Sequence, residues 1–376
     1  MNQTKLTDFR KSLHQNPELS GYEVETQNRI KQFIKAETEL EGKNVGQFGT
    51  LYSFDFAPGK KVLIRVDCDA LPIQEIKDFA HKSKIDGVSH KCGHDGHTAI
   101  GAGLVMKLHN EPLSLGSVDV VFQPAEEIGE GAKGILDDSN FDISRYDYAV
   151  ALHNIPGKPL HQVLYKKDGF TPAVQSLIIK LKGKTAHAAQ PLTGHNPSYA
   201  ISEIIKWALE NEQTDENHPN YHLITPVFTE IGSRDYGISA GYGEVHFTIR
   251  SWEQSKMESV TESFLTKVKS TAAAHQLDLS HEFTAVFAAN QNNHFVVDQI
   301  LQSAKDLGLS HTEKTEPFPW GEDFGLFTQT IPGAMFGLGS GESTPALHNP
   351  DYDYPDEITE TGINLFYAIA KHIVES

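Results

Sequence analysis

Apolar and polar positions alternate between two spacings over the first part of the chain. Runs of apolar residues typical of buried strands are separated by stretches with apolar positions three or four apart, which is typical of amphipathic helices. Pro17 interrupts the first helical stretch, and Ser20 followed by Glu23 has the spacing of a capping box. Strands that alternate with helices predict an α/β layer on a largely parallel sheet with helices on both faces. The predicted helices span residues 5–14, 21–36 and 98–109, and the predicted strands span residues 61–66, 118–122 and 148–152.

The pattern changes near Phe170. The order that follows is β-α-β-β-α-β, which matches a ferredoxin-like unit, and α/β character then returns. We therefore expect a catalytic domain of residues 1–170 and 285–376 with a small α+β domain, residues 171–284, inserted into it. The predicted strands here span residues 174–181, 221–231, 244–251, 279–286 and 334–338, and the helices span 197–209, 253–274, 297–307 and 358–374.

Composition and charge narrow the class of protein. The 376 residues are 39% hydrophobic and 22% charged, which is typical of a globular protein of about two domains. Apolar runs stay well short of the roughly 20 residues that cross a bilayer, and the polar N-terminus has no apolar signal core, so we expect a cytoplasmic protein without membrane contact. A formal charge of −18, with lysine and arginine nowhere clustered, argues against nucleic-acid binding. Two cysteines exclude a disulfide framework.

The densest group of potential metal ligands lies in residues 90–97, which read His-Lys-Cys-Gly-His-Asp-Gly-His. Thiolate, imidazole and carboxylate side chains bind borderline-soft divalent ions. Cys92 and His94, two residues apart on a predicted loop, can both turn toward one ion. A polar loop capping the next helix, with Asp95 or Thr98 at its N-terminus, would explain a single histidine. Three histidines, a cysteine and an aspartate within eight residues favour metal binding.

Two adjacent carboxylates, Glu126 and Glu127, follow the apolar run at residues 118–122. Such a pair at the end of a strand is usually a solvated turn. Beside a metal ion the pair has a second interpretation. One carboxylate can ligate the ion, while the other takes a proton from water and delivers it to a leaving nitrogen.

Other polar groups also follow apolar runs. Asp67 and Asp69 come directly after the first strand, His153 lies at the end of the third, and His348 comes about ten residues after the strand at 334–338. Each alone is typical of a turn or of a satisfied histidine, and the two aspartates could instead orient a metal ligand. Because α/β sheets form their sites at the carboxyl ends of the strands, the shared position of these groups predicts one pocket.

The inserted domain contributes two candidates. His187 follows the strand at 174–181, within Gly-Lys-Thr-Ala-His-Ala-Ala, and Arg250 comes at the end of the strand at 244–251. A turn histidine and a surface arginine are the simpler interpretations. In the functional interpretation, the two side chains bind the oxyanion and the carboxylate of the substrate, because arginine suits bidentate carboxylate binding.

Taken together, these stretches resemble the M20 metallopeptidase family, in particular its amidohydrolase branch. That branch includes hippurate hydrolases, auxin-conjugate hydrolases and N-acetyl-diaminopimelate deacetylases. The matching stretches occur in the family's order from Arg65 to Pro350, so the resemblance covers nearly the whole chain. They read RVDCDALP, HKCGHDGHTA, FQPAEE, LHN, GKTAHAAQP, TIR, WGEDFG and LHNP.

The resemblance implies specific roles. Glu126 would be the general base and acid, and Asp67 the acid that orients a ligand. His187 matches the inserted-domain histidine that in related dimers reaches the neighbouring subunit's site, which implies a homodimer with the inserted domain as lid and interface. The implied ligands of two divalent ions are Cys92, His94, Glu127, His153 and His348.

The expected reaction is metal-dependent hydrolysis of the amide bond of an N-acyl amino acid, with zinc, manganese, cobalt or nickel as the metal. A dipeptidase or aminopeptidase with the same machinery is the alternative enzyme, and a metal-bearing binding protein without catalysis is the alternative outside enzymes. A structural zinc protein fits less well, because its ligands usually come in CxxC-type pairs. Residues 231–241 lack the asparagine and proline of the family's Gly-Gly-x-x-x-Asn-x-Ile-Pro stretch, which helps shape the substrate end in relatives.

Overall fold

Two separate hydrophobic cores organise the chain, each in its own structural unit. The computed structural model describes residues 3–376. The first unit comprises residues 3–170, Asn290–Phe318 and Glu322–Ser376, and the second comprises Thr171–Ala289 with Pro319–Gly321. The second unit is therefore inserted into the sequence of the first. No helix among the described residues is long and apolar enough to span a bilayer.

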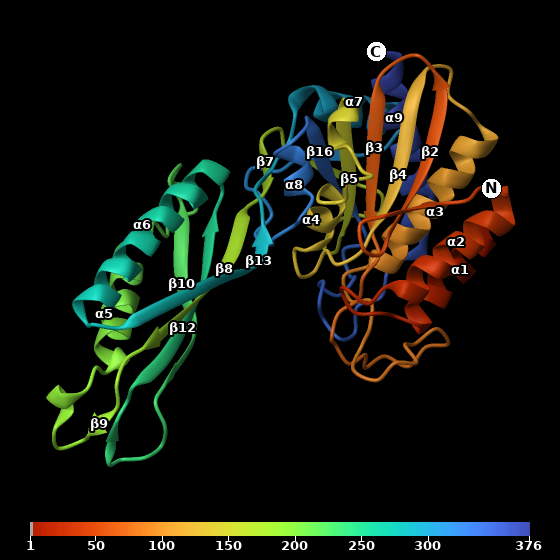
Figure 1. Cartoon of the computed structure of the whole chain (residues 1–376). Coiled ribbons are helices and arrows are strands. Elements are labelled where there is room, and N and C mark those ends of the chain that lie inside the picture. The colour runs from red at the N-terminus through yellow and green to blue at the C-terminus, as the bar shows by residue number, and fades with distance from the viewer. Residues whose placement is uncertain (1–2) are drawn as a thin grey trace. The chain divides into compact units, whose positions relative to one another are not determined.

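The first unit is built on an eight-stranded mixed sheet with the order β1-β2-β4-β3-β5-β16-β6-β15. Figure 1 labels five consecutive strands of this sheet, β2-β4-β3-β5-β16. Its centre is parallel: β3 pairs in parallel with β4 and β5, and β16 pairs in parallel with β5. The edge strand pair β1 and β2 joins β4 in antiparallel fashion. The strands are β1 (Lys43–Val45), β2 (Gly49–Ala57), β3 (Lys61–Asp67), β4 (Gly116–Gln123), β5 (Tyr148–Ile155), β6 (Val163–Tyr165), β15 (His311–Glu313) and β16 (Gly333–Gly339).

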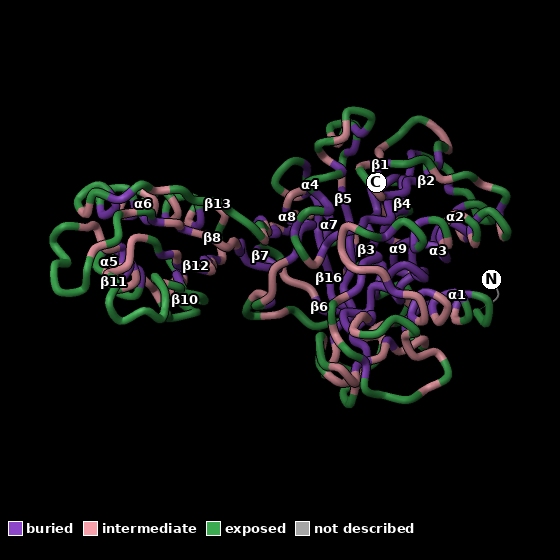
Figure 2. The backbone as a smooth tube through the Cα atoms, turned by 60° about the horizontal axis from the view of Figure 1, so that its bottom comes forward, coloured by how far each residue is buried: buried purple, intermediate pink, exposed green. Residues whose placement is uncertain are grey.

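The central strands β3, β4 and β5 are buried along almost their whole length (Figure 2). Their two faces differ in chemistry. Because successive side chains of a strand point to opposite faces, Val62, Ile64 and Val66 of β3 enter the large apolar core, while Arg65 and Asp67 face the other way. The alternation in β4 and β5 is the same and sends Gln123 and His153 to the polar side. The sheet therefore separates a hydrophobic core from a buried layer of charge.

Long helices cover the apolar face, where α3 contacts α1, α2 and α9, and both α3 and α9 contact β3. The short helices α4 and α8 contact each other, and they also contact β4 and β16, respectively. The helices of this unit are α1 (Gln3–Gln15), α2 (Val24–Thr38), α3 (His94–Asn110), α4 (Gly131–Leu136), α7 (His294–Asp306), α8 (Gly325–Thr328) and α9 (Thr359–Glu375), with 3₁₀ turns η1 (Ile143–Arg145) and η3 (Asp356–Ile358).

The predicted capping box at the start of α2 is wrong. The helix begins at Val24, and Glu23 in the N-cap position makes no side-chain cap hydrogen bond. The Ser20 hydroxyl instead donates to Asp69 at 2.7 Å, and the Glu18 carboxylate accepts from the backbone N–H of Thr26 at 2.7 Å. Ser20 and Glu23 are residue types found in capping boxes, but the turn before the helix directs their side chains to Asp69 and Ala125 and not to the helix N-terminus.

The second unit has the element order β8-α5-β10-β12-α6-β13 and a four-stranded antiparallel sheet with the order β10-β12-β8-β13. Helices α5 and α6 contact each other and this sheet, and they close the second core. This is the predicted ferredoxin-like unit, and the predicted fold class is confirmed for the chain. The elements are β8 (Ala173–Lys182), α5 (Pro197–Glu210), β10 (His222–Ile231), β12 (Tyr242–Ser251), α6 (Gln254–Ala274) and β13 (Asp278–Phe287), with the small strands β9 (Ala186–His187) and β11 (Ile238–Ser239) and the 3₁₀ turn η2 (Pro191–Thr193). Two further short strands, β7 (Gly169–Thr171) and β14 (Asn290–Gln291), pair with each other.

Two glycines of α4 give a matched test of the packing around the loop after β4. A Cβ on Gly131 would lie 1.8 Å from the carbonyl oxygen of Pro124, whereas a Cβ on Gly134 would meet nothing within 4 Å. We expect Gly131→Ala to lower the free energy of unfolding by about 1–3 kcal/mol, because backbone must shift. Gly134→Ala should cost nothing or add up to about 1 kcal/mol. Urea unfolding of the metal-free protein measures both, and equal effects would contradict this packing.

Candidate metal centre

Parallel strands deliver three of the candidate groups to one edge of the first unit's sheet. Asp67 is the last residue of β3, and Gln123 is the last residue of β4, directly before the loop that carries Glu126 and Glu127. His153 lies near the end of β5, which is parallel to β3. The side chains of Asp67 and His153 are buried, as is that of Glu126.

A glycine turn brings the His-rich loop to the same edge. Gly93 caps α3 with a φ of 90°, and a Cβ there would lie 2.5 Å from the side-chain nitrogen of Asn154. This close approach lets Asn154 Nδ2 donate to the carbonyl of Cys92 at 2.7 Å. Helix α3 begins at His94, four residues earlier than the sequence pattern predicts, so His94 is held by the first helical turn and not by a loop.

A second backbone contact anchors the segment that carries His348. The His348 N–H donates to the carbonyl of Lys91 at 2.8 Å, and His348 itself adopts a φ of 64°. Its Nε2 lies 3.5 Å from Glu127 Oε2. The imidazole, about half exposed, therefore reaches the edge of the cluster from a loop after β16.

The structure brings all of the side chains proposed as metal ligands together in one place. Within each of three overlapping groups, the potential ligand atoms lie within 4.8 Å of one another. Cys92 Sγ is 3.5 Å from His153 Nε2, and His94 Nε2 is 3.8 Å from Glu127 Oε1. The groups are Cys92–His94–His153, Cys92–Glu127–His348 and His94–Glu126–Glu127.

The donor set fits a divalent cation. Among the residues that the structure describes, the buried atoms His94 Nε2 and Glu127 Oε1 have no hydrogen-bond partner, although buried polar atoms are normally paired. Both atoms belong to the cluster of thiol, imidazole and carboxylate groups, which are the ligands that zinc and similar ions prefer. A cation bound there would satisfy both atoms at once.

The electrostatics of the cluster agree with this fit. Burial alone lowers the pKa of His94, but the charges of Asp67 and Asp69 outweigh it and raise the pKa to about 10. Burial and the nearby Glu127 carboxylate raise the pKa of the Cys92 thiol well above its usual value. The pocket thus favours a bound positive charge, and a metal ion would displace the protons from both groups.

Asp69 holds two of the cluster residues at once. One carboxylate oxygen lies 3.0 Å from His94 Nδ1, and the other accepts from the backbone N–H of Glu127 at 2.9 Å. Asp67, the acid that the family resemblance favours, lies 2.6 Å from His97 Nδ1 and 3.8 Å from His94 Nε2. The sequence leaves both aspartates open as turn acids or as acids that orient a metal ligand, because strand alternation alone does not show which acid of a pair turns back toward a histidine.

A buried arginine organises the charge behind the cluster. Arg65 donates to Asp67 at 2.6 Å, to Glu322 at 2.8 Å and to Asp323 at 2.7 Å. Burial together with the negative charges of Glu322 and neighbouring carboxylates raises the pKa of Glu126 well above its usual value. Sequence reasoning gave Arg65 and the Glu322–Asp323 pair no role. The available signal was an arginine within an otherwise apolar strand run.

The other two candidates belong to the second unit. His187 is exposed on β9, pairs with Ile238 of β11, and its Nδ1 accepts from the N–H of Ala189 at 3.1 Å. Arg250, the second-last residue of β12, donates to the carbonyl of Pro319. Burial lowers the pKa of Arg250. Both side chains are thus held by local contacts within the second unit.

Comparison with known proteins gives a consistent result over the whole length of the chain. An N-acetylcysteine deacetylase of Bacillus subtilis is 28% identical over 377 residues, which cover 99% of this chain and 98% of the relative. A hippurate hydrolase of Campylobacter jejuni is 27% identical over 373 residues, covering 98% of this chain and 96% of the relative.

A solved structure shares the architecture. The crystal structure of a dinuclear metal-binding peptidase of the M20 family from Bacillus subtilis superimposes with a TM-score of 0.83 at 27% identity, covering 99% of this chain and 98% of the other. Residues 63–372 match the family described as peptidase family M20/M25/M40. The chain therefore belongs to peptidase family M20/M25/M40, as its sequence resemblance predicts.

Proposed function

We propose that this hydrolase of amide bonds is a metal-dependent amidohydrolase that releases the acyl group of an N-acyl amino acid. The gathering of a thiol, three imidazoles and two carboxylates at one edge of the sheet carries the proposal. Two relatives of nearly full length, an N-acetylcysteine deacetylase and a hippurate hydrolase, support the substrate class. Their names imply different acyl groups at similar identity, so the proposal covers the class and not one acyl group.

The proposed metal site holds two divalent ions, with zinc, manganese, cobalt and nickel all compatible with the donor set. The related dinuclear metal-binding peptidase supports the number of ions. When bound, the ions would supply Lewis acidity toward the amide carbonyl and lower the pKa of a water molecule toward neutrality. The ligands would be Cys92, His94, Glu127, His153 and His348.

Glu126 is the proposed general base and acid. It is buried beside Glu127 and within reach of the same cluster, with Oε2 4.0 Å from His94 Nε2. Its carboxylate would take a proton from the attacking water and deliver that proton to the departing nitrogen. Burial and nearby carboxylates raise the pKa of Glu126 above its usual value, so this carboxylate holds a proton more readily than an exposed glutamate does.

The remaining roles extend the proposal to both units. Asp67 is held by its contacts with Arg65 and His97, and its negative charge would therefore stay in a fixed position beside the metal ligands. His187 would stabilise the oxyanion of the tetrahedral intermediate, a contribution of about 3 kcal/mol for one donor. Arg250 would bind the substrate carboxylate. The second unit would act as a lid and as the interface of a homodimer.

Paired substrates separate an amidohydrolase from a dipeptidase. We expect metal-loaded protein to cleave N-acyl amino acids, because its proposed machinery contacts an amide and needs no free α-amine. A mass-spectrometric screen should use amides varied on both sides, together with dipeptides of the same sequence in N-acylated and free forms. Turnover restricted to the free dipeptides would contradict the deacylase proposal and favour the peptidase.

Replacing Glu126 tests catalysis separately from metal binding. Glu126→Gln keeps the side-chain shape but cannot carry the proton, so we expect turnover to fall by about 10²–10⁴-fold. Metal content, measured by mass spectrometry of the purified protein, should stay at the wild-type level. Glu130→Gln is the control, because Glu130 is an exposed residue of the same loop. Wild-type turnover in Glu126→Gln would remove Glu126 from its proposed role.

A further inference from the structure

The turn between α1 and α2, residues 18–23, touches two segments of the candidate site. Its backbone bridges Ala70, whose N–H donates to the carbonyl of Glu18 at 2.9 Å. Its Ser20 hydroxyl donates to Asp69, the residue that holds His94 and Glu127. The turn is therefore fixed against the segment that follows β3.

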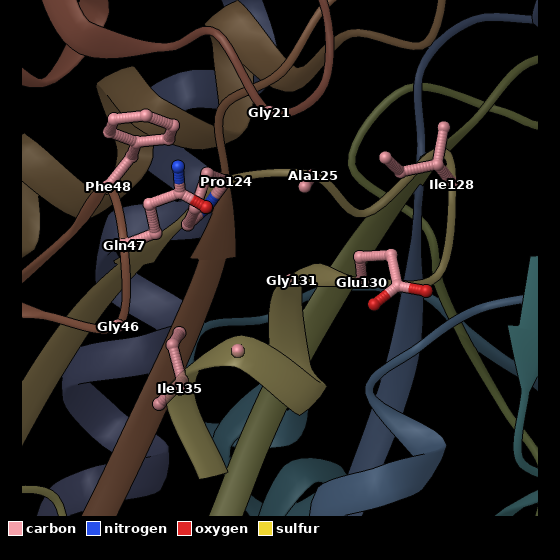
Figure 3. Close-up of a pocket in the computed structure, with 11 residues that line it drawn as sticks. Gly21, Gly46, Gln47, Phe48, Pro124, Ala125, Ile128, Glu130, Gly131 and Ile135 are labelled. Atoms are coloured by element: carbon pink, nitrogen blue, oxygen red, sulfur yellow. The ribbon is translucent and has the colours of Figure 1, made fainter. Parts of the chain in front are cut away.

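The same turn also reaches the loop that follows β4. The buried Glu23 carboxylate accepts from the backbone N–H of Ala125 at 2.7 Å, across 102 positions of sequence. Figure 3 shows Gly21 of the turn and Ala125 beside the same cavity of about 330 Å³. Glu23 is thus the side chain through which the turn holds the residue immediately before Glu126.

Ala125 needs such support. Its φ of 55° lies in the left-handed region, which costs an L-residue free energy and persists only where surrounding contacts enforce it. The carbonyl of Ala125 accepts from the N–H groups of Glu130 and Gly131, and its own N–H is bound by Glu23. Both backbone polar groups of this strained residue are therefore hydrogen-bonded.

The segment Glu126–Glu127 is consequently fixed at both ends by carboxylates from other elements. Glu23 binds the N–H of the preceding Ala125, and Asp69 binds the N–H of Glu127. A backbone held at two points so close together leaves little freedom for the side chains between them. These two backbone anchors would direct the side chains of Glu126 and Glu127 toward the cluster of proposed metal ligands.

We propose that Glu23 is a positioning residue: through Ala125 it sets the backbone geometry that directs Glu126 and Glu127 into the metal centre. The inference rests on the proposed function of that centre. Helix capping does not account for Glu23, because its side chain makes no cap hydrogen bond and Glu18 binds the Thr26 N–H instead. Glu23 acts on the reaction only through the loop.

Two substitutions of Glu23 separate the effect of side-chain length from the effect of the carboxyl group. Glu23→Gln keeps the length and an acceptor oxygen for the Ala125 N–H, whereas Glu23→Asp keeps the carboxyl group but is one methylene shorter. We expect Glu23→Asp to lower kcat by about 10-fold or more with little change in KM, because small displacements of catalytic groups are costly. Glu23→Gln should restore kcat to near the wild-type value.

A readout independent of turnover accompanies the kinetics. The visible absorption spectrum of the Co²⁺-substituted protein should change in Glu23→Asp, because Glu127 is displaced, and should be unchanged in Glu23→Gln. Glu18→Ala is the control from the same turn: it removes the cap of α2 and should lower the unfolding midpoint while kcat and the Co²⁺ spectrum stay at wild-type values.

Wild-type kcat and spectrum in Glu23→Asp would overturn the inference, as would a loss in Glu23→Gln equal to or greater than that in Glu23→Asp, which would indicate a role for the carboxyl group. Failure of the proposed function is a different result. If wild-type protein cleaves no N-acyl amino acid, the Co²⁺ spectra of the two Glu23 variants still decide whether Glu23 positions the loop.

Discussion

A charge removed from water must be compensated by nearby partners, and this requirement governs the polar face of the first unit's sheet. Arg65 forms ion pairs with Asp67, Glu322 and Asp323, so one buried positive charge is shared among three carboxylates. In the neighbouring ligand cluster, carboxylates lie close to imidazole and thiol groups. Two buried atoms of this cluster, His94 Nε2 and Glu127 Oε1, have no hydrogen-bond partner among the described residues. Divalent ions would complete the compensation, so charge balance and the proposed chemistry depend on the same side chains.

The cluster combines groups held with different rigidity. His153 lies on a central strand and His94 in the first turn of a helix, so both follow the fold directly. Glu126 and Glu127 lie on a loop, and His348 lies on another loop with a positive φ. Loop residues need outside contacts to reach a fixed geometry, which Asp69 and the carbonyl of Lys91 supply. Contacts of this kind matter because catalytic groups tolerate little displacement.

Sequence reasoning recovers what depends on periodicity and on residue type. The α/β layer, the ferredoxin-like order and the parallel centre follow from apolar spacing, and the Cys92-to-His97 stretch is visible as a cluster of metal-binding residue types. Contacts distant in sequence are not visible in this way. Ser20 and Glu23 have the spacing of a capping box, yet they bind Asp69 and Ala125 after the chain has folded. Strand β2 is missing from the predicted strands although Tyr52, Phe54 and Phe56 alternate with Ser53 and Asp55, which is the period of a strand. Arg65 shows its partners only when Glu322 and Asp323 are in place.

The proposed chemistry requires a pair of divalent ions at one edge of the first unit's sheet. Anomalous diffraction from crystals of the zinc- or manganese-loaded protein, together with metal analysis of the same sample, tests it most directly. We expect two ions per chain, with anomalous peaks contacted by the thiol of Cys92, the imidazoles and the Glu127 carboxylate. Metal below one equivalent, or peaks remote from these side chains, would contradict it.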